Sequence, residues 1–348
     1  MNAYEKNKIK NLLPEELEIA VSQMALPEYR YRQISDWIFT KKIKSFDEMS
    51  NVPIKARNLL SDEFQIDTVK IKKIESSSDG TKKFCFELDD GLLVESVLIP
   101  SDELLTLCIS SQSGCSLGCK FCATGGIGFN RNLTCGEIID QFIFVSRELP
   151  PGVNIKNIVF MGMGEPLLNF KEVKKALILL TSENAIGFSP SKITVSTSGI
   201  YSRLEEFGKL KLAELAISLN AADNKKRSSI MPVNNKYPLN ALIKKCKEYP
   251  LNPREKITFE YVLLSGFNDT PQDTENIKKL LSGIKCKINL IPFNEFEGCG
   301  FKSPGRQDIL KFQAILRNFG FDVLIRNSRG QDISAACGCL AARSAKNP

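Results

Sequence analysis

The 348-residue chain contains no histidine, and that absence excludes whole classes of chemistry. Without an imidazole there can be no serine–histidine or cysteine–histidine catalysis and no zinc site with mixed cysteine and histidine ligands. No run approaches the about 20 apolar residues of a membrane span, and the start of the chain lacks the apolar core of a signal peptide. We therefore expect a cytoplasmic protein, not bound to a membrane, whose chemistry relies on cysteines, carboxylates and a bound cofactor.

The remaining composition is that of an ordinary soluble protein. Hydrophobic residues make up 43% and charged residues 25% of the chain, and the length favours two domains or one barrel with attachments. The net charge of +7 is compatible with a nucleic-acid partner. Eleven cysteines, odd in number and unevenly spaced, suit a reducing compartment better than a disulfide scaffold.

Three regions with different patterns follow one another along the chain. Residues 1–64 have helical periodicity and predict an accessory domain. Its basic residues could contact phosphate or form a solvated helix face, and Tyr29, Tyr31 and Trp37 are candidates for stacking on unpaired bases. Residues 65–103 predict a small β extension of hairpins, in which Glu95 reads by pattern alone as a carboxylate facing solvent.

From residue 104 to 326, strands alternate with helices, which is typical of a parallel sheet with crossover helices. The predicted fold is α/β: a partial (β/α)6 TIM-like barrel with the N-terminal helical domain and the β extension attached, followed by a C-terminal segment, 327–348. The expected strands are 104–110, 157–161, 192–197, 213–219, 256–264 and 287–292, and the expected helices are 134–147, 170–180, 201–207, 239–249, 271–281 and 307–319.

The most specific motif is C-x3-C-x2-C, formed by Cys115, Cys119 and Cys122. Clustered thiolates favour zinc, copper(I) or iron–sulfur clusters, and a structural zinc site would need a fourth ligand. A four-iron cluster held by three cysteines leaves one iron open, as a reactive site requires. The spacing is the signature of radical S-adenosylmethionine (SAM) enzymes, and it predicts one 4Fe–4S cluster in this loop.

Polar and glycine-rich residues follow the other predicted strands. In barrels of parallel strands the active site lies at the carboxyl ends of the strands. We expect a ring of small-molecule contacts there, with Glu165 and neighbouring carbonyl groups approaching the amino group of SAM. Two further cysteines are of interest, Cys108 within the first strand and Cys337 after the last. By pattern alone Cys108 reads as a core thiol and Cys337 as a tail thiol, and their spacing does not pair them.

At these residues the chain resembles, almost end to end, the ribosomal RNA adenine-C2 methyltransferases, a radical SAM family that modifies 23S rRNA and, in some bacteria, tRNA. The resemblance implies 23S rRNA and tRNA as substrates, an electron donor such as flavodoxin, and a monomer. The matching stretches are 108–115, 119–125, 161–169, 195–199, 217–219, 231–232, 261–262, 268–269, 289–292 and 335–338.

The resemblance also implies a two-stage reaction that uses two SAM molecules per turnover. One SAM methylates Cys337, and the second yields a 5′-deoxyadenosyl radical that takes a hydrogen from that methyl group. The methylene radical adds to C2 of adenine, which is too poor a nucleophile for simple methyl transfer. Cys108 then resolves the adduct by a disulfide with Cys337, and Glu95 accepts the C2 proton. The implied SAM contacts are Gly164, Glu165, Ser196, Ser218, Leu219, Asn220 and Asn294.

Two positions depart from the family pattern, and two other functions remain open. Asn220 stands where the family usually has histidine, and Cys339 stands where it commonly has glutamine. A sister group methylates C8 of the same adenine, although Pro166 after Glu165 favours C2 here. The other alternative is a non-enzymatic iron–sulfur protein that binds RNA or senses redox state.

Overall fold

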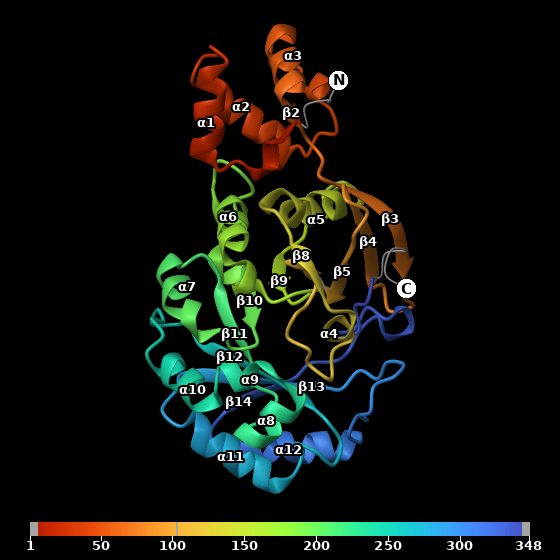
Figure 1. Cartoon of the computed structure of the whole chain (residues 1–348), viewed down its shortest axis with the longest axis vertical. Coiled ribbons are helices and arrows are strands. Elements are labelled where there is room, and N and C mark those ends of the chain that lie inside the picture. Colours follow the sequence, from red (N-terminus) through yellow and green to blue (C-terminus); the bar gives the residue numbers. More distant parts are fainter. Residues whose placement is uncertain (1–5, 102–103, 343–348) are drawn as a thin grey trace.

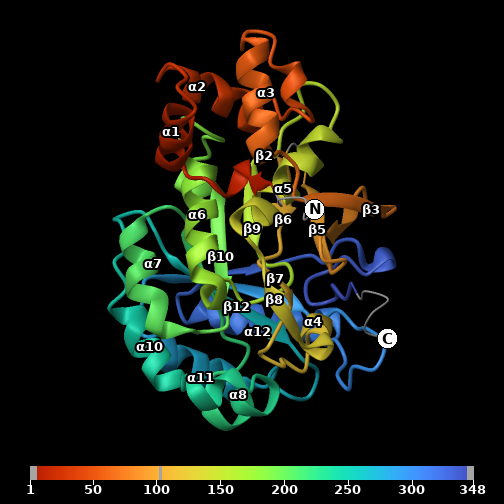
Figure 2. The same cartoon turned by 45° about the horizontal axis from the view of Figure 1, so that its top comes forward.

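The structure is a computed structural model that describes residues 6–101 and 104–342. The outermost parts of the predicted accessory domain (1–5), β extension (102–103) and C-terminal segment (343–348) lie outside the described residues. Figures 1 and 2 show the N-terminal helices as a separate lobe above a curved sheet, whose outer side is covered by helices.

One ten-stranded sheet forms the body of the molecule. Seven neighbouring strands are parallel, from β6 to β14, so the predicted α/β barrel is confirmed with one strand more than the six expected. They are β6 (Leu104–Cys108), β9 (Asn157–Phe160), β10 (Ile193–Thr197), β11 (Glu214–Ser218), β12 (Ile257–Leu263), β13 (Cys286–Pro292) and β14 (Asp322–Ile325).

The β extension is part of this sheet and not a separate unit. Its strands β3 (Val69–Ser76), β4 (Lys82–Leu88) and β5 (Leu93–Ser101) are antiparallel, and β5 pairs with β6 at the edge of the barrel. The turns at Asp79-Gly80 and Asp90-Gly91 join them as the sequence predicts. A rigid antiparallel edge therefore borders the opening of the barrel.

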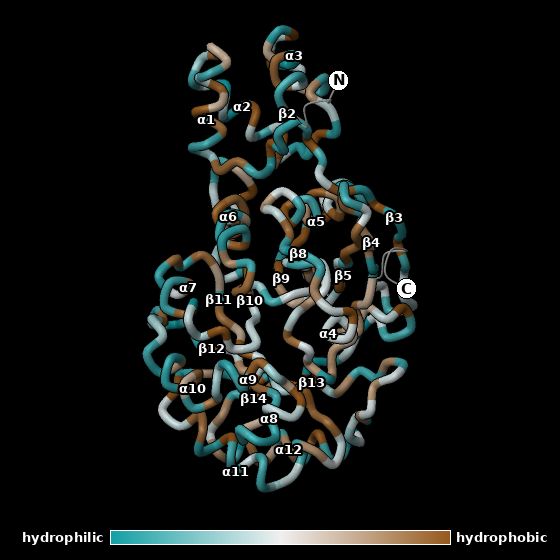
Figure 3. The backbone as a smooth tube through the Cα atoms, in the orientation of Figure 1, coloured by the Kyte–Doolittle hydropathy of each residue, from teal (hydrophilic) through white to brown (hydrophobic). Residues whose placement is uncertain are grey.

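Helices between the parallel strands bury their apolar faces against the sheet. In Figure 3 much of the tube along these strands is brown, the colour of hydrophobic residues. Thr134 and Glu137 form the predicted capping box: Glu137 N–H donates to the threonine hydroxyl (3.3 Å) and Thr134 N–H to the carboxylate (2.8 Å). None of the described helices is long and apolar enough to cross a bilayer. The helices are α4 (Ala123–Ile127), α5 (Cys135–Arg147), α6 (Phe170–Thr181), α7 (Leu204–Leu210), α8 (Asn224–Ile230), α9 (Val233–Lys236), α10 (Leu239–Lys247), α11 (Pro271–Leu281) and α12 (Arg306–Asn318).

The accessory domain contains α1 (Pro14–Gln23), α2 (Arg30–Ser35) and α3 (Ile54–Glu63), with Pro14 in the first turn of α1 as predicted. Three aromatic residues of this domain were candidates for RNA contact. The prediction for Tyr31 is wrong, because its side chain is buried in the core of this lobe. Tyr29 is exposed beside the Arg30 guanidinium (4.8 Å from the ring centroid), and Lys41 lies 3.5 Å from the Trp37 ring.

A buried ionic network fastens this lobe to the barrel. Lys10, just before α1, and Asp140 on α5 form an ion pair with no exposed side-chain surface. Asp140 also accepts hydrogen bonds from the backbone and hydroxyl of Thr68 (2.6 Å each), and Lys10 reaches Asp67 at 3.0 Å. The network therefore joins the start of the lobe, the linker at 66–68 and α5.

Removing Asp140 leaves the buried Lys10 ammonium group with only the partly exposed Asp67 as a partner, and leaves the Thr68 donors without their acceptor. We expect Asp140→Ala to lower the free energy of unfolding by about 3–5 kcal/mol. As a control, Glu205→Ala breaks the exposed pair with Lys209 and should cost less than about 0.5 kcal/mol. Thermal and urea unfolding of both variants measure the difference, and equal losses would contradict a structural role for the buried pair.

Candidate active site

The three motif cysteines lie in a closed loop between β7 (Gln112–Gly114) and α4. Cys115 N–H donates to the Gly128 carbonyl (2.8 Å), which closes the loop. Gly114 has φ +74°, and a Cβ there would lie 1.9 Å from that same carbonyl oxygen, so only glycine fits. Cys115, Cys119 and Cys122 all line one cavity at the carboxyl ends of the parallel strands.

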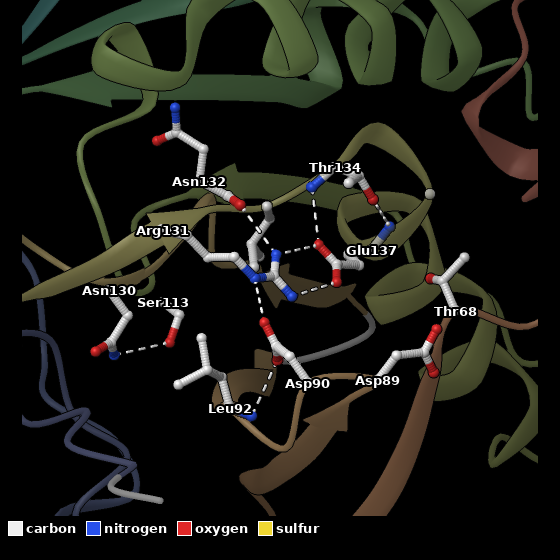
Figure 4. A network of polar contacts seen from close by, with 12 residues as sticks. Thr68, Asp89, Asp90, Leu92, Ser113, Asn130, Arg131, Asn132, Thr134 and Glu137 are labelled. Atoms are coloured by element: carbon white, nitrogen blue, oxygen red, sulfur yellow. Dashed lines mark hydrogen bonds and ion pairs between the residues drawn. The ribbon is translucent and has the colours of Figure 1, made fainter. Parts of the chain in front are cut away.

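Arg131 fastens the base of this loop (Figure 4). It lies on β8 (Phe129–Asn132), which pairs with β7. Its guanidinium donates two hydrogen bonds to Glu137 (2.8 and 2.9 Å) and one to Asp90. The hydrogen bonds to Glu137 and Asp90 raise the pKa of Arg131, so the cation is permanent. The loop is thereby tied to the start of α5 and to a turn of the β extension.

The surroundings of two loop thiols, Cys115 and Cys119, disfavour their anionic form. Burial raises the pKa of Cys115 to about 12, and burial raises that of Cys119 as well, each thiol also being disfavoured as an anion by its motif neighbours. Iron ions would offset this cost, since thiolates are their preferred soft ligands. Within residues 6–101 and 104–342, no three cysteine, aspartate or glutamate side chains converge closely enough to hold a single metal ion.

Glu165, at the end of β9, lines the cavity but has most of its hydrogen-bonding capacity in use. Its carboxylate accepts from Leu167 N–H (3.0 Å) and from Ser198 N–H (2.7 Å), and burial raises its pKa. Gly164 beside it has φ +95°, and a Cβ there would lie 2.4 Å from Gln112. The pair Gly164-Glu165 therefore fixes the ends of β9 and β10 relative to each other.

Of the three SAM contacts predicted after β11, Ser218 and Asn220 line the cavity and Leu219 does not. Ser218 lines the cavity 3.5 Å from the hydroxyl of Ser196, whereas the Leu219 side chain is buried outside the cavity lining. Asn220 adopts φ +56°, and its side-chain oxygen accepts from Val262 N–H (2.9 Å). Asn220 thus supports the neighbouring strand, and asparagine tolerates a left-handed backbone better than most residues.

Asn294, after β13, contacts the C-terminal segment. Its amide donates to the carbonyl of Cys337 (3.1 Å) and accepts from Gln331 (3.1 Å). Cys337 is exposed on the cavity wall, and Cys108 at the end of β6 is buried in the same lining. Both thiols are free, and burial raises the pKa of Cys108 to about 11. The structure thus brings together two cysteines that lie far apart in the sequence.

The structure buries both Glu95 and Cys339. The expectation that Glu95 faces solvent is wrong: its side chain is buried, because the C-terminal segment covers it. Glu95 lines a second cavity on the other side of the cluster loop, together with Cys339 and Cys122. Cys339 is buried, with its sulfur 3.8 Å from the Asn294 carbonyl oxygen, so it does not share the position of Cys337.

Sequence reasoning missed Glu260 and Arg326, which both line the main cavity. Glu260, on β12, accepts from Ser196 (3.1 Å), while its other oxygen lies 3.7 Å from the Arg326 guanidinium and has no hydrogen bond. Burial raises the pKa of Glu260. The sequence did contain a signal for Glu260, because it is a charged residue in the middle of a mostly apolar parallel strand.

Comparisons with known proteins agree with this geometry. Residues 109–281 match the radical SAM superfamily, and residues 8–66 match the ribosomal RNA large subunit methyltransferase N-terminal domain. The dual-specificity RNA methyltransferase RlmN of Syntrophus aciditrophicus is 46% identical over 97% of this chain and 97% of its own length. The RlmN of Geobacter sulfurreducens is 47% identical, over 95% and 91%. The chain belongs to the RlmN family of radical SAM RNA methyltransferases.

A solved relative has the same fold. The crystal structure of a radical SAM methyltransferase from Sphaerobacter thermophilus is 37% identical, covers 97% of this chain and 100% of its own, and superposes with a TM-score of 0.92. The family's cofactors, a 4Fe–4S cluster and SAM, fit the residues present, because three soft thiol donors border a cavity lined with hydroxyl and carboxylate groups.

Cluster binding tests the assignment of the loop. Cys115→Ala should reduce iron and sulfide, after anaerobic reconstitution, to the level of a blank, because two thiolates cannot hold the cluster. Cys246→Ala, on α10 and absent from the cavity lining, should retain both. Iron and sulfide analysis with visible absorption spectra measures this, and a Cys115→Ala protein with full cluster content would show that the loop is not the site.

Proposed function

We propose that this enzyme methylates C2 of an adenine in 23S rRNA and of an adenine in tRNA, with Cys337 as the methyl carrier and Cys108 as the resolving thiol. One observation carries the proposal: Cys108, Cys337 and the three loop cysteines line the same cavity. A methyl group carried by Cys337 would therefore stand within the space where the cofactors and the target base must meet.

Each stage assigns a task to a residue of the chain. When bound, the cluster and SAM supply the methyl group and the one-electron chemistry that an unreactive C2 position needs. Cys337 gives up its proton and takes a methyl group from SAM, releasing S-adenosylhomocysteine. After carbon–carbon bond formation, loss of one electron, which the bound cluster would take up, and of the C2 proton leaves a thioether between Cys337 and the base. The Cys108 thiolate then attacks the sulfur of Cys337, the bond from that sulfur to carbon breaks, and the carbon takes up a proton to become the methyl group of the released base. An external thiol or dithiol reduces the resulting disulfide.

The cavity wall supports these steps electrostatically. Arg326 lines the same cavity as Glu260 and the two cysteines, and its positive charge opposes the effect of burial on the pKa of the Cys108 thiol. A fixed cation beside a buried thiol favours the thiolate, which is the reactive form. Glu95 is proposed as the acceptor of the C2 proton.

The accessory lobe supports an RNA substrate. Exposed Tyr29 beside Arg30, and Trp37 beside Lys41, combine a flat ring with a cation. Such pairs hold unpaired bases by stacking and the backbone by charge. We propose that the enzyme acts as a monomer in the cytoplasm and receives electrons from a donor such as flavodoxin.

The product identifies the reaction. Reconstituted enzyme with SAM and a strong reductant should form 5′-deoxyadenosine and convert adenosine to C2-methyladenosine in both 23S rRNA fragments and total tRNA. Cys337→Ala should form no methylated RNA, and Cys108→Ala should accumulate a covalent protein–RNA adduct because its resolution is blocked. Mass spectrometry against C2- and C8-methyladenosine standards measures the products.

Three other results would contradict parts of the proposed function. A product methylated only at C8 would contradict the proposed position. RNA binding without any 5′-deoxyadenosine would contradict an enzymatic role and favour a binding or redox-sensing protein. Methylation of rRNA fragments but not of tRNA would remove the second substrate from the proposal.

A further inference from the structure

The C-terminal residues 330–342, here named the carrier segment, are held on both sides of Cys337 by one buried ion pair. Before Cys337, the Lys83 ammonium group on β4 donates to the Ile333 carbonyl at 2.7 Å. After it, the Glu95 carboxylate on β5 accepts from Ala341 N–H at 2.9 Å and from Ala342 N–H at 3.2 Å. Lys83 and Glu95 lie 3.4 Å apart. The two ends of one ion pair thus clamp the segment.

This pair differs from an ordinary surface salt bridge. Only 8% of Lys83 and 6% of Glu95 is exposed, because the carrier segment covers them. The only other charged partner of Lys83 among the described residues is Glu75, at 3.2 Å, and Cys85 lies opposite Glu95 across the strands. A buried carboxylate that loses its backbone donors would be left poorly solvated, which makes the docked arrangement strongly preferred.

The opposite side of the carrier segment is held by weaker, neutral contacts. Ala123 N–H donates to the Gly338 carbonyl (2.7 Å), and the Thr124 hydroxyl donates to the Leu340 carbonyl (2.6 Å). Both donors follow directly after the loop cysteine Cys122. The segment therefore lies between the cluster loop and the sheet edge. Among the described residues, its charged anchors are those on the sheet edge and at the turn around Asp79.

We infer that Glu95, together with Lys83, is a positioning latch that docks the carrier segment and sets the place of Cys337 at the cavity. Charge-assisted hydrogen bonds to backbone donors are about twice as strong as neutral ones. Neutralising the carboxylate therefore loosens the segment without altering the sheet that carries it.

Under the proposed function, proton transfer to Glu95 also releases the carrier segment. When a proton moves from C2 of the adduct to a carboxylate oxygen of Glu95, the carboxylate loses its charge and one acceptor site. Its hold on Ala341 and Ala342 then weakens, so that proton uptake and release of the carrier segment are coupled. One residue would thus complete the reaction and free the segment for the next methylation.

Hydrogen–deuterium exchange of the reconstituted holoenzyme tests the latch without RNA or turnover. Glu95→Ala should speed exchange in peptides covering 334–342 by about ten- to a hundredfold, the ratio expected for hydrogen bonds to a charged acceptor. Lys83→Met should speed exchange mainly around Ile333. Glu95→Gln keeps one neutral acceptor and should restore part of the protection.

Controls separate the latch from general loss of structure. Glu87→Gln breaks the exposed pair with Lys72 on the same hairpin, away from Lys83 and the segment, and exchange of 334–342 should stay within about twofold of the parent, as for surface substitutions. Peptides of β9–β12 should exchange at parental rates in every variant. Unchanged exchange of 334–342 in both Glu95→Ala and Glu95→Gln would overturn the latch.

A second readout distinguishes positioning from mere stability. In Glu95→Gln, the rate of S-methylation of Cys337 at saturating SAM should fall while the half-saturating SAM concentration stays at the parental value. If the parent itself shows no methylation of Cys337, the proposed function fails, and the exchange data still decide the latch. An equal rate in parent and variant, with faster exchange, would overturn the positioning role.

Discussion

The docking of residues 330–342 between the cluster loop and strands β4 and β5 is the contact on which the rest of the site depends. It is made by three stretches far apart in the sequence, around Lys83 and Glu95, around Thr124, and around Asn294. Because of it, the exposed thiol of Cys337 faces the same cavity as the three loop cysteines. Without this docking, Cys337 would be a tail cysteine with no defined relation to the barrel.

The sheet holds the residues that dock the C-terminal segment at a fixed position relative to the barrel. The β extension continues the parallel barrel through the pairing of β5 with β6, so Glu95 stands on the same continuous sheet as Cys108. The Ser110 hydroxyl donates to the Glu95 carbonyl at 2.6 Å and strengthens this connection. Arg131 joins the cluster loop to the same extension through Asp90. The hairpins therefore belong to the site, and they hold the cluster loop and the carrier segment in one frame.

Local sequence signals predicted much of this architecture. The cysteine spacing, the Thr134 capping box and the polar residues after each strand depend on neighbours in the chain, and the structure confirms the strands and helices they mark. Glu95 and Lys83 were not predictable as buried, because alternation in a strand counts charged residues as solvent-facing unless a distant segment covers them. Likewise, only the fold brings Cys108 near Cys337, and only the fold turns Asn220 toward Val262.

The central claim is that Cys337, and no other thiol near the cavity, is the methyl carrier. The most direct measurement is anaerobic incubation of the reconstituted enzyme with SAM that carries a deuterated methyl group, followed by digestion and fragment-ion mass spectrometry. The account predicts the label on Cys337, with none on Cys339, whose buried sulfur lies against the Asn294 carbonyl. Label on Cys339, or on neither cysteine, would contradict it.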